Sequence, residues 1–177
     1  DAAQRKLAHT WELSATAQAL VGVHPGRANA LVAEAIDAGV IGELAGYALR
    51  RGEVRYGERS RIDWLLQQPQ RADCYVEVKS VTALDEHGLA FFPDAVSARG
   101  ARHMHELAAM VAQGARAVVL FCVQRGDALA LRAADEIDPA YGRALRAALH
   151  RGVEAYAYRA AVDTRGIALV RRIPVLP

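Results

Sequence analysis

Two short apolar runs decide the fold of this chain, Arg61-Ile-Asp-Trp-Leu-Leu66 and Cys74-Tyr-Val-Glu-Val-Lys-Ser-Val81. Both are rich in β-branched and aromatic residues, so both are predicted to be strands. The segment 67–73 between them is polar and contains a proline, which is typical of a hairpin loop. Side chains alternate along a strand, so Glu77 and Lys79 are expected on one face of the second strand and Val78 on the other.

Three charged residues stand inside these apolar runs: Asp63, Glu77 and Lys79. Burying an unpaired charge costs several kcal/mol, so each of them needs a partner. A divalent cation would neutralise both carboxylates, and Mg²⁺ prefers oxygen ligands of the kind that Asp63, Glu77 and the backbone carbonyl of Val78 offer. Lys79 would then orient an attacking water or stabilise charge on a phosphoryl oxygen. The alternative is a structural ion pair on a half-exposed sheet.

The choice of lysine at position 79 supports a chemical role. The chain has 22 basic residues, and of these only Lys6 and Lys79 are lysine. Arginine is a planar, permanently charged fork, whereas the lysine ammonium is a compact charge whose pKa can shift. An ammonium beside a nucleophilic water is therefore a specific choice in this sequence.

A helix is predicted over residues 29–39, with Asn29 as its N-cap and Gly39 at its end. Its apolar arc contains Leu31, and Glu34 lies about 60° from that residue at the rim of the arc. Glu34 is therefore a candidate fourth acidic group for the metal site. A solvated helix glutamate is an equally good interpretation.

Basic residues gather at two places that could contact phosphate. Segment 50–61 contains five arginines, of which Arg59 and Arg61 are candidates for phosphate contact, while a solvated hairpin face better explains Arg50 and Arg51. The second place is the start of a helix predicted over residues 97–114, where Ser97, Arg99 and Arg102 stand near backbone N–H groups that favour anions. The histidines of this helix, at positions 103 and 105, are interpreted as surface residues.

The remaining pattern predicts an α/β fold. Residues 115–123 form an apolar run typical of a central strand. Asp138-Pro139 predicts the start of a helix that ends at Gly152, and segments 153–161 and 167–170 are predicted strands. Strands are also expected around residues 9–13 and over 19–23. The resulting order places a mixed sheet between helices, with both cysteines, Cys74 and Cys122, in its core.

The overall composition excludes several classes of protein. At 177 residues and 53% apolar, the chain suits one globular domain and a leftover segment. No apolar stretch approaches the ~20 residues that a transmembrane helix needs, and the start does not have the pattern of a signal peptide. We therefore expect a cytoplasmic protein without membrane contact. The net charge of +2 is a weak argument for nucleic acid by itself.

The spacing of Asp63 and Glu77-Val78-Lys79 resembles the PD-(D/E)xK nuclease motif, whose acidic residues bind a metal ion and whose lysine assists hydrolysis. Four ordered segments further resemble the sugar fermentation stimulation protein A family: 56–63, 75–82, 92–100 and 135–139. This resemblance implies an OB-like barrel followed by a PD-(D/E)xK restriction-endonuclease-like domain. Segment 5–13 is similar to the end of the barrel. Residues 1–25 are thus expected to be a remnant of the OB-like domain and a linker, and residues 26–177 the nuclease-like domain.

The resemblance and the residues together predict a DNA-binding protein with a nuclease-type site that uses Mg²⁺ or Mn²⁺ for phosphodiester hydrolysis. Members of the family are described as non-specific DNA binders proposed to regulate sugar utilisation. A non-catalytic regulator of sugar (maltose-type) metabolism is therefore the main alternative, and an interaction protein without a nucleic-acid role is a third. DNA is the expected partner, and a homo-oligomer is possible.

Overall fold

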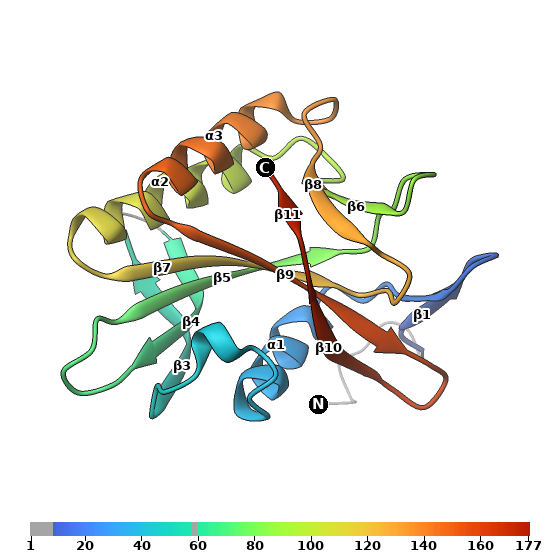
Figure 1. Ribbon diagram of the computed structural model, residues 1–177, viewed down its shortest axis with the longest axis horizontal. Helices are drawn as coiled ribbons and strands as arrows, with labels where there is room; N and C mark the ends of the chain where they lie inside the picture. Colours follow the sequence, from blue (N-terminus) through green and yellow to red (C-terminus); the bar gives the residue numbers. More distant parts are fainter. Residues whose placement is uncertain (1–8, 58–59) are drawn as a thin grey trace.

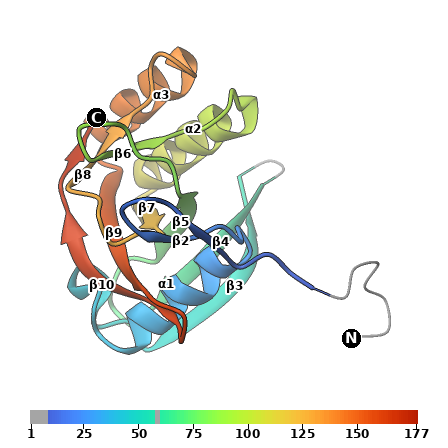
Figure 2. The same cartoon turned by 90° about the vertical axis from the view of Figure 1, so that its right-hand side faces the viewer.

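The computed structural model describes residues 9–57 and 60–177. In these residues three α-helices and the strands of the main sheet form three layers, with α1 on one face of the sheet and α2 and α3 on the other (Figure 1, Figure 2). In the described residues the elements are, in chain order, β1 (Leu13–Ala15), β2 (Leu20–Gly22), α1 (Arg27–Asp37), the 3-10 turn η2 (Gly42–Leu44), β3 (Leu49–Tyr56), β4 (Ser60–Gln67), β5 (Cys74–Val81), β6 (Leu89–Phe92), α2 (Ala98–Ala112), β7 (Arg116–Val123), β8 (Ala130–Ala133), α3 (Pro139–His150), β9 (Glu154–Val162), β10 (Ile167–Ile173) and β11 (Val175–Leu176).

The main sheet is mixed, as the sequence predicted. Its order is β10-β9-β7-β5-β4-β3 over the described residues. Strands β5, β7 and β9 are parallel to one another, whereas β4 pairs antiparallel with both β3 and β5. The predicted hairpin of the two apolar runs is thus confirmed as β4 and β5. Strand β5 lies where the sheet changes from antiparallel to parallel pairing.

The main sheet separates two hydrophobic cores, one on each of its faces. The core under α2 and α3 contains Phe121 and Leu107, and the core under α1 contains Leu120 and Val78. Adjacent residues of β7 therefore enter opposite cores, which explains why the whole strand is apolar. Cys74 and Cys122 are buried and free, as predicted.

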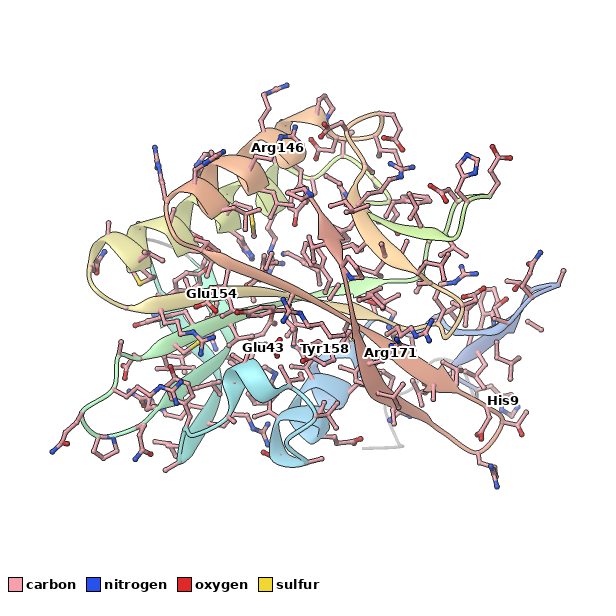
Figure 3. All side chains as sticks on the ribbon, in the orientation of Figure 1. His9, Glu43, Arg146, Glu154, Tyr158 and Arg171 are labelled. Carbon is pink, nitrogen blue, oxygen red and sulfur yellow. The ribbon has the colours of Figure 1, made fainter. Side chains whose placement is uncertain are left out.

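Polar contacts attach the loop around η2 to strands β7, β9 and β10 of the main sheet. Glu43 accepts hydrogen bonds from the hydroxyl of Tyr158 and from Nη1 of Arg172, both at 2.6 Å. Arg116 donates to Glu154 at 2.6 and 2.7 Å at the start of the neighbouring strands. Figure 3 shows Glu43, Tyr158 and Glu154 at this end of the sheet.

The ends of the elements correct several predictions. Helix α1 begins at Arg27 with Gly26 as N-cap, so Asn29 is not the cap, and Gly39 follows the helix with a φ of 71°. The first strand is Leu13–Ala15, later than the predicted 9–13. Asp138 caps α3 as predicted, accepting from the backbone N–H groups of Ala140 and Tyr141.

A small second sheet was missed. It has the order β11-β8-β6 in the described part of the chain, with parallel pairing throughout. The outer strands of the main sheet, β3 and β10, carry exposed arginines such as Arg51 and Arg171. Strand β10 also has a register irregularity between Leu169 and Arg171.

Candidate functional site

Strands β4 and β5 separate at the point where the predicted site residues stand. Their paired residues run from Leu66–Cys74 to Trp64–Val76, and Asp63 and Glu77 would be the next pair. Instead, the Asp63 carboxylate enters the space between the strands, where its Oδ2 accepts the backbone N–H of Val78 at 2.7 Å. The strands therefore part at Asp63 and Glu77, and the gap between them holds the Asp63 carboxylate.

Helix α1 fixes the other oxygen of Asp63. The side-chain amide of Asn29 donates to Asp63 Oδ1 at 2.9 Å. This contact gives Asn29 a role at the site in place of the capping role that the sequence suggested. In an extended strand the N–H and C=O of one residue point to the same side, so the Val78 carbonyl is directed toward the gap as well.

Glu77 lies on the other face of the sheet, under α2. Its Oε1 accepts from Lys79 Nζ at 2.7 Å and from Nδ1 of His103. Its side chain is only 5% exposed, and that of Lys79 is 12% exposed. Glu77 Oε2 is buried and has no hydrogen-bond partner among residues 9–57 and 60–177. The predicted pairing of faces is confirmed, since Val78 enters the α1 core instead.

The pKa values of the two carboxylates are shifted in opposite directions. Burial raises the pKa of Asp63, and the charge of Glu77 raises it further, while hydrogen bonds from Val78 and Asn29 only partly offset this. Burial also acts to raise the pKa of Glu77, but the His103 hydrogen bond and the Lys79 ammonium outweigh it, and the pKa is lowered. The surroundings of Glu77 thus favour its ionised form, whereas burial and the charge of Glu77 disfavour ionisation of Asp63.

Tyr56 and Glu106 adjoin this cluster and were missed in the sequence. Burial raises the pKa of the buried Tyr56 hydroxyl, and so do the charges of Glu77, Glu106 and Asp63, which places all three carboxylates near it. Glu106 extends from α2 to the β3–β4 turn, where a Cβ on Gly57 would lie 3.2 Å from its Oε1. The hydroxyl and Glu106 Oε2 are buried without a hydrogen-bond partner in the described part of the chain.

The arginine candidates are distributed around α2 and β4. Ser97 caps α2 by accepting the N–H of Gly100, so its hydroxyl already has a structural role. Arg99 and Arg102 are exposed on the first turns of that helix, and Arg61 is exposed two residues before Asp63. Arg59 lies outside the described residues.

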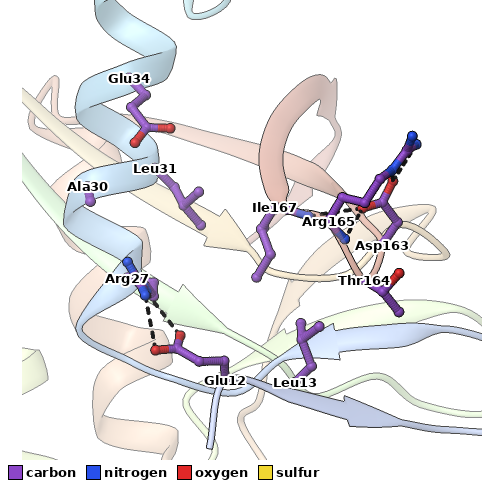
Figure 4. A pocket seen from close by; sticks show the side chains of 11 residues that line it. Glu12, Leu13, Arg27, Ala30, Leu31, Glu34, Asp163, Thr164, Arg165 and Ile167 are labelled. Carbon is purple, nitrogen blue, oxygen red and sulfur yellow. Dashed lines mark hydrogen bonds and ion pairs between the residues drawn. The ribbon is translucent and has the colours of Figure 1, made fainter. Parts of the chain in front are cut away.

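Glu34 is not brought into the cluster. It is exposed and lines a separate pocket of about 310 Å³ between α1, β1 and the β9–β10 turn (Figure 4). Arg27 and Glu12 form an ion pair of 2.9 Å in its wall, and Asp163 with Arg165 form another of 3.1 Å. None of the three residues of the predicted catalytic cluster lines this pocket.

Asp63, Glu77 and the Val78 carbonyl offer oxygen atoms, the donors that a hard cation prefers. Within residues 9–57 and 60–177, no three His, Cys, Asp or Glu side chains come close enough to form a metal cage. Mg²⁺ commonly uses one or two carboxylates and keeps several waters. Two carboxylates, Asp63 and Glu77 with its bare Oε2, are present here beside the carbonyl of Val78.

These observations define a class: a mixed α/β domain in which a β-hairpin opens beside Asp63, Lys79 and the buried Glu77. Residues 26–166 match the family model described as "Sugar fermentation stimulation protein RE domain". The chain belongs to the sugar fermentation stimulation protein family.

No helix in the described ranges combines the length and apolar character needed to cross a membrane.

Relatives in sequence and structure agree with this assignment. A sugar fermentation stimulation protein homolog of Thioalkalivibrio sulfidiphilus is 53% identical over 173 residues, covering 97% of this chain and 73% of the relative. A homolog of Pseudomonas paraeruginosa is 55% identical over 178 residues, covering 99% and 75%. The solved structure of Pyrococcus furiosus SfsA in complex with Ca²⁺ is 28% identical, with a TM-score of 0.80, and covers 90% of this chain and 68% of that one.

Proposed function

We propose that this chain binds DNA and hydrolyses its phosphodiester bonds with a divalent cation, Mg²⁺ or Mn²⁺, held at Asp63 and Glu77. The observation that carries the proposal is the opening of the β4–β5 hairpin. There, one carboxylate replaces a strand hydrogen bond, accepting from Val78, and the other keeps a buried bare oxygen. Such an arrangement lowers the stability of the fold, because burying a polar atom without a hydrogen-bond partner is unfavourable. The cost is explained if the atoms serve a ligand.

The opposite pKa shifts support a cation at this position. Asp63 has a raised pKa because it is buried near the charge of Glu77, so positive charge placed between the carboxylates would relieve the repulsion. The relative from P. furiosus is described in complex with Ca²⁺, another hard cation that prefers oxygen ligands. When bound, such a cation lowers the pKa of a coordinated water and stabilises charge on phosphoryl oxygens.

The contact between Lys79 and Glu77 supports a role for Lys79 in hydrolysis. Its ammonium is 2.7 Å from Glu77 Oε1 and is half-buried, so it can donate to a water or to a phosphoryl oxygen beside the same carboxylate. Hydrolysis adds the water oxygen to phosphorus and breaks the P–O bond to one sugar. One proton of the water ends on the leaving hydroxyl.

The DNA contacts are proposed on the exposed arginines that surround the gap. Arg99 and Arg102 lie on the first turns of α2, the helix whose His103 contacts Glu77, and Arg61 lies on β4 close to Asp63. Arginine forks match phosphate geometry and would position the backbone without reading its sequence.

The proposal is tested by incubating the purified chain with single- and double-stranded DNA in Mg²⁺ or Mn²⁺. We expect cleavage by the wild type, none by Asp63→Ala, and a loss of roughly 10²–10³ in rate for Lys79→Ala, the effect typical of removing one transition-state contact. Glu86→Ala, which changes a carboxylate 87% exposed, is the matched control and should retain full activity.

DNA binding is measured in parallel as a function of salt. Phosphate contacts release counterions, so affinity should fall steeply with ionic strength and survive Lys79→Ala. Absence of cleavage on every substrate with salt-dependent binding retained would favour the non-catalytic regulator of sugar metabolism. Absence of both would favour an interaction protein.

A further inference from the structure

We propose that His103, oriented by Arg99, is a positioning residue that holds Glu77 with Oε2 directed toward the cation. This inference rests on the proposed function, since it assigns a role in the same site. His103 is 2% exposed and lies on α2, opposite the α1 side from which Asn29 supports Asp63. Each carboxylate of the site would thus have a helix residue that fixes it.

The distribution of donors on Glu77 is the first step. Lys79 Nζ and His103 Nδ1 both donate to Oε1, and Oε2 has no hydrogen-bond partner within the ranges 9–57 and 60–177. Two donors on one oxygen fix the rotation of the carboxylate. The second oxygen is consequently presented bare, in the way a ligand for a hard cation has to be.

The tautomer of His103 is the second step. Arg99 Nε lies 3.3 Å from His103 Nε2 and can only donate, because a guanidinium has no acceptor. His103 Nε2 is therefore the acceptor in this contact, which assigns the ring proton to Nδ1, the nitrogen that faces Glu77. Arg99 and His103 are four residues apart on α2, so both lie on the same face of the helix.

The result is a chain of hydrogen bonds from the exposed Arg99 through buried His103 to the buried Glu77. In known metal sites such outer partners orient the ligand, and their loss typically costs 10–100-fold in metal affinity. A histidine that only filled the core would affect folding but would have no specific effect on cation affinity.

The test is calorimetric titration of the full chain with Mn²⁺ alone. We expect His103→Ala to weaken Mn²⁺ binding by roughly 10–100-fold and His103→Asn, whose amide nitrogen can take the place of Nδ1, to recover most of the loss. His105→Ala changes the exposed histidine two residues further on and should bind as the wild type does.

Arg99→Ala keeps the test decisive if His103→Ala does not fold, because Arg99 is exposed. It should weaken Mn²⁺ binding by up to about tenfold through loss of the His103 orientation. If the wild type binds Mn²⁺ and either His103→Ala or Arg99→Ala binds it equally well, the role of His103 is refuted while the proposed function is not. It is also overturned if His103→Asn is no better than a folded His103→Ala. If the wild type takes up no Mn²⁺, the proposed function fails together with it.

Discussion

Glu77 should be the most costly polar residue to remove from the site, and the size of the cost depends on the replacement. Both of its donors, Lys79 and His103, bind Oε1, so the carbonyl oxygen of Glu77→Gln can accept from both of them. That variant loses mainly the charge, which is worth about 1–3 kcal/mol for hydrogen bonds to an ionised group. Glu77→Ala removes the acceptor as well as the charge, so the Lys79 ammonium and the His103 N–H both lose their partner, and breaking a buried pair in this way costs about 3–5 kcal/mol.

These magnitudes are measured by urea and thermal unfolding at pH 7 in a chelating buffer, so that no cation contributes. In a chain of this size 1 kcal/mol corresponds to about 2–4 °C, and Glu77→Ala should lower Tm by roughly 6–20 °C. Glu86→Gln, at an exposed carboxylate, is the control without effect. The reasoning is refuted if Glu77→Ala unfolds within about 1 kcal/mol of the wild type, or if Glu77→Gln is as damaging as Glu77→Ala.

Two further predictions concern pH. The pKa of Asp63 is raised by burial and by Glu77, so its contribution to stability is complete below its ordinary value of 3.8 and is lost as pH rises through the raised pKa. Without metal, Asp63→Asn should therefore be more stable than the wild type at pH 7 and approach it near pH 4; a gap in urea unfolding that is constant with pH would contradict this. The pKa of Asp138 is lowered by backbone N–H groups of Ser97 and Tyr141, so its contribution is present above 3.8 and lost as pH falls. Asp138→Ala should cost about 1–2 kcal/mol at pH 7, the usual worth of a helix cap, and the cost should shrink in acid; an equal cost at pH 2 would sink the argument.

The parts of the fold that the sequence predicted well have a strong local signal. Strand β7 is apolar throughout because both of its faces are covered, and α3 begins where Asp138 precedes a proline. The hairpin of β4 and β5 and the faces of Glu77 and Lys79 follow from the alternation of side chains alone.

The missed features depend on contacts between distant segments. The second sheet consists of strands with at most four residues, and its β6–β8 and β8–β11 pairs join segments separated by long connections. Asn29 has a side chain suited to capping, but its partner is Asp63, 34 residues away. No local pattern distinguishes these two uses of an amide.

His103 is the residue that sequence reasoning placed wrongly, since it is buried rather than on the surface. A usable signal was present: His103 is four residues before Leu107, so helical periodicity places it on the apolar arc of α2. A polar residue on such an arc needs a buried partner, and here that partner is Glu77.

The arginines on β3 and β10 have a consequence for the solution behaviour of the protein. These strands are the two outer strands of the main sheet, and one side of each backbone has no neighbouring strand within the described residues. Exposed edges of this kind template pairing with other chains, and charged side chains and register irregularities prevent it. Arg51 and Arg55 are exposed on β3, outside the site. Replacing both with valine would leave an uncharged edge strand that can pair with other chains, and we expect the resulting aggregation to limit the yield of soluble protein.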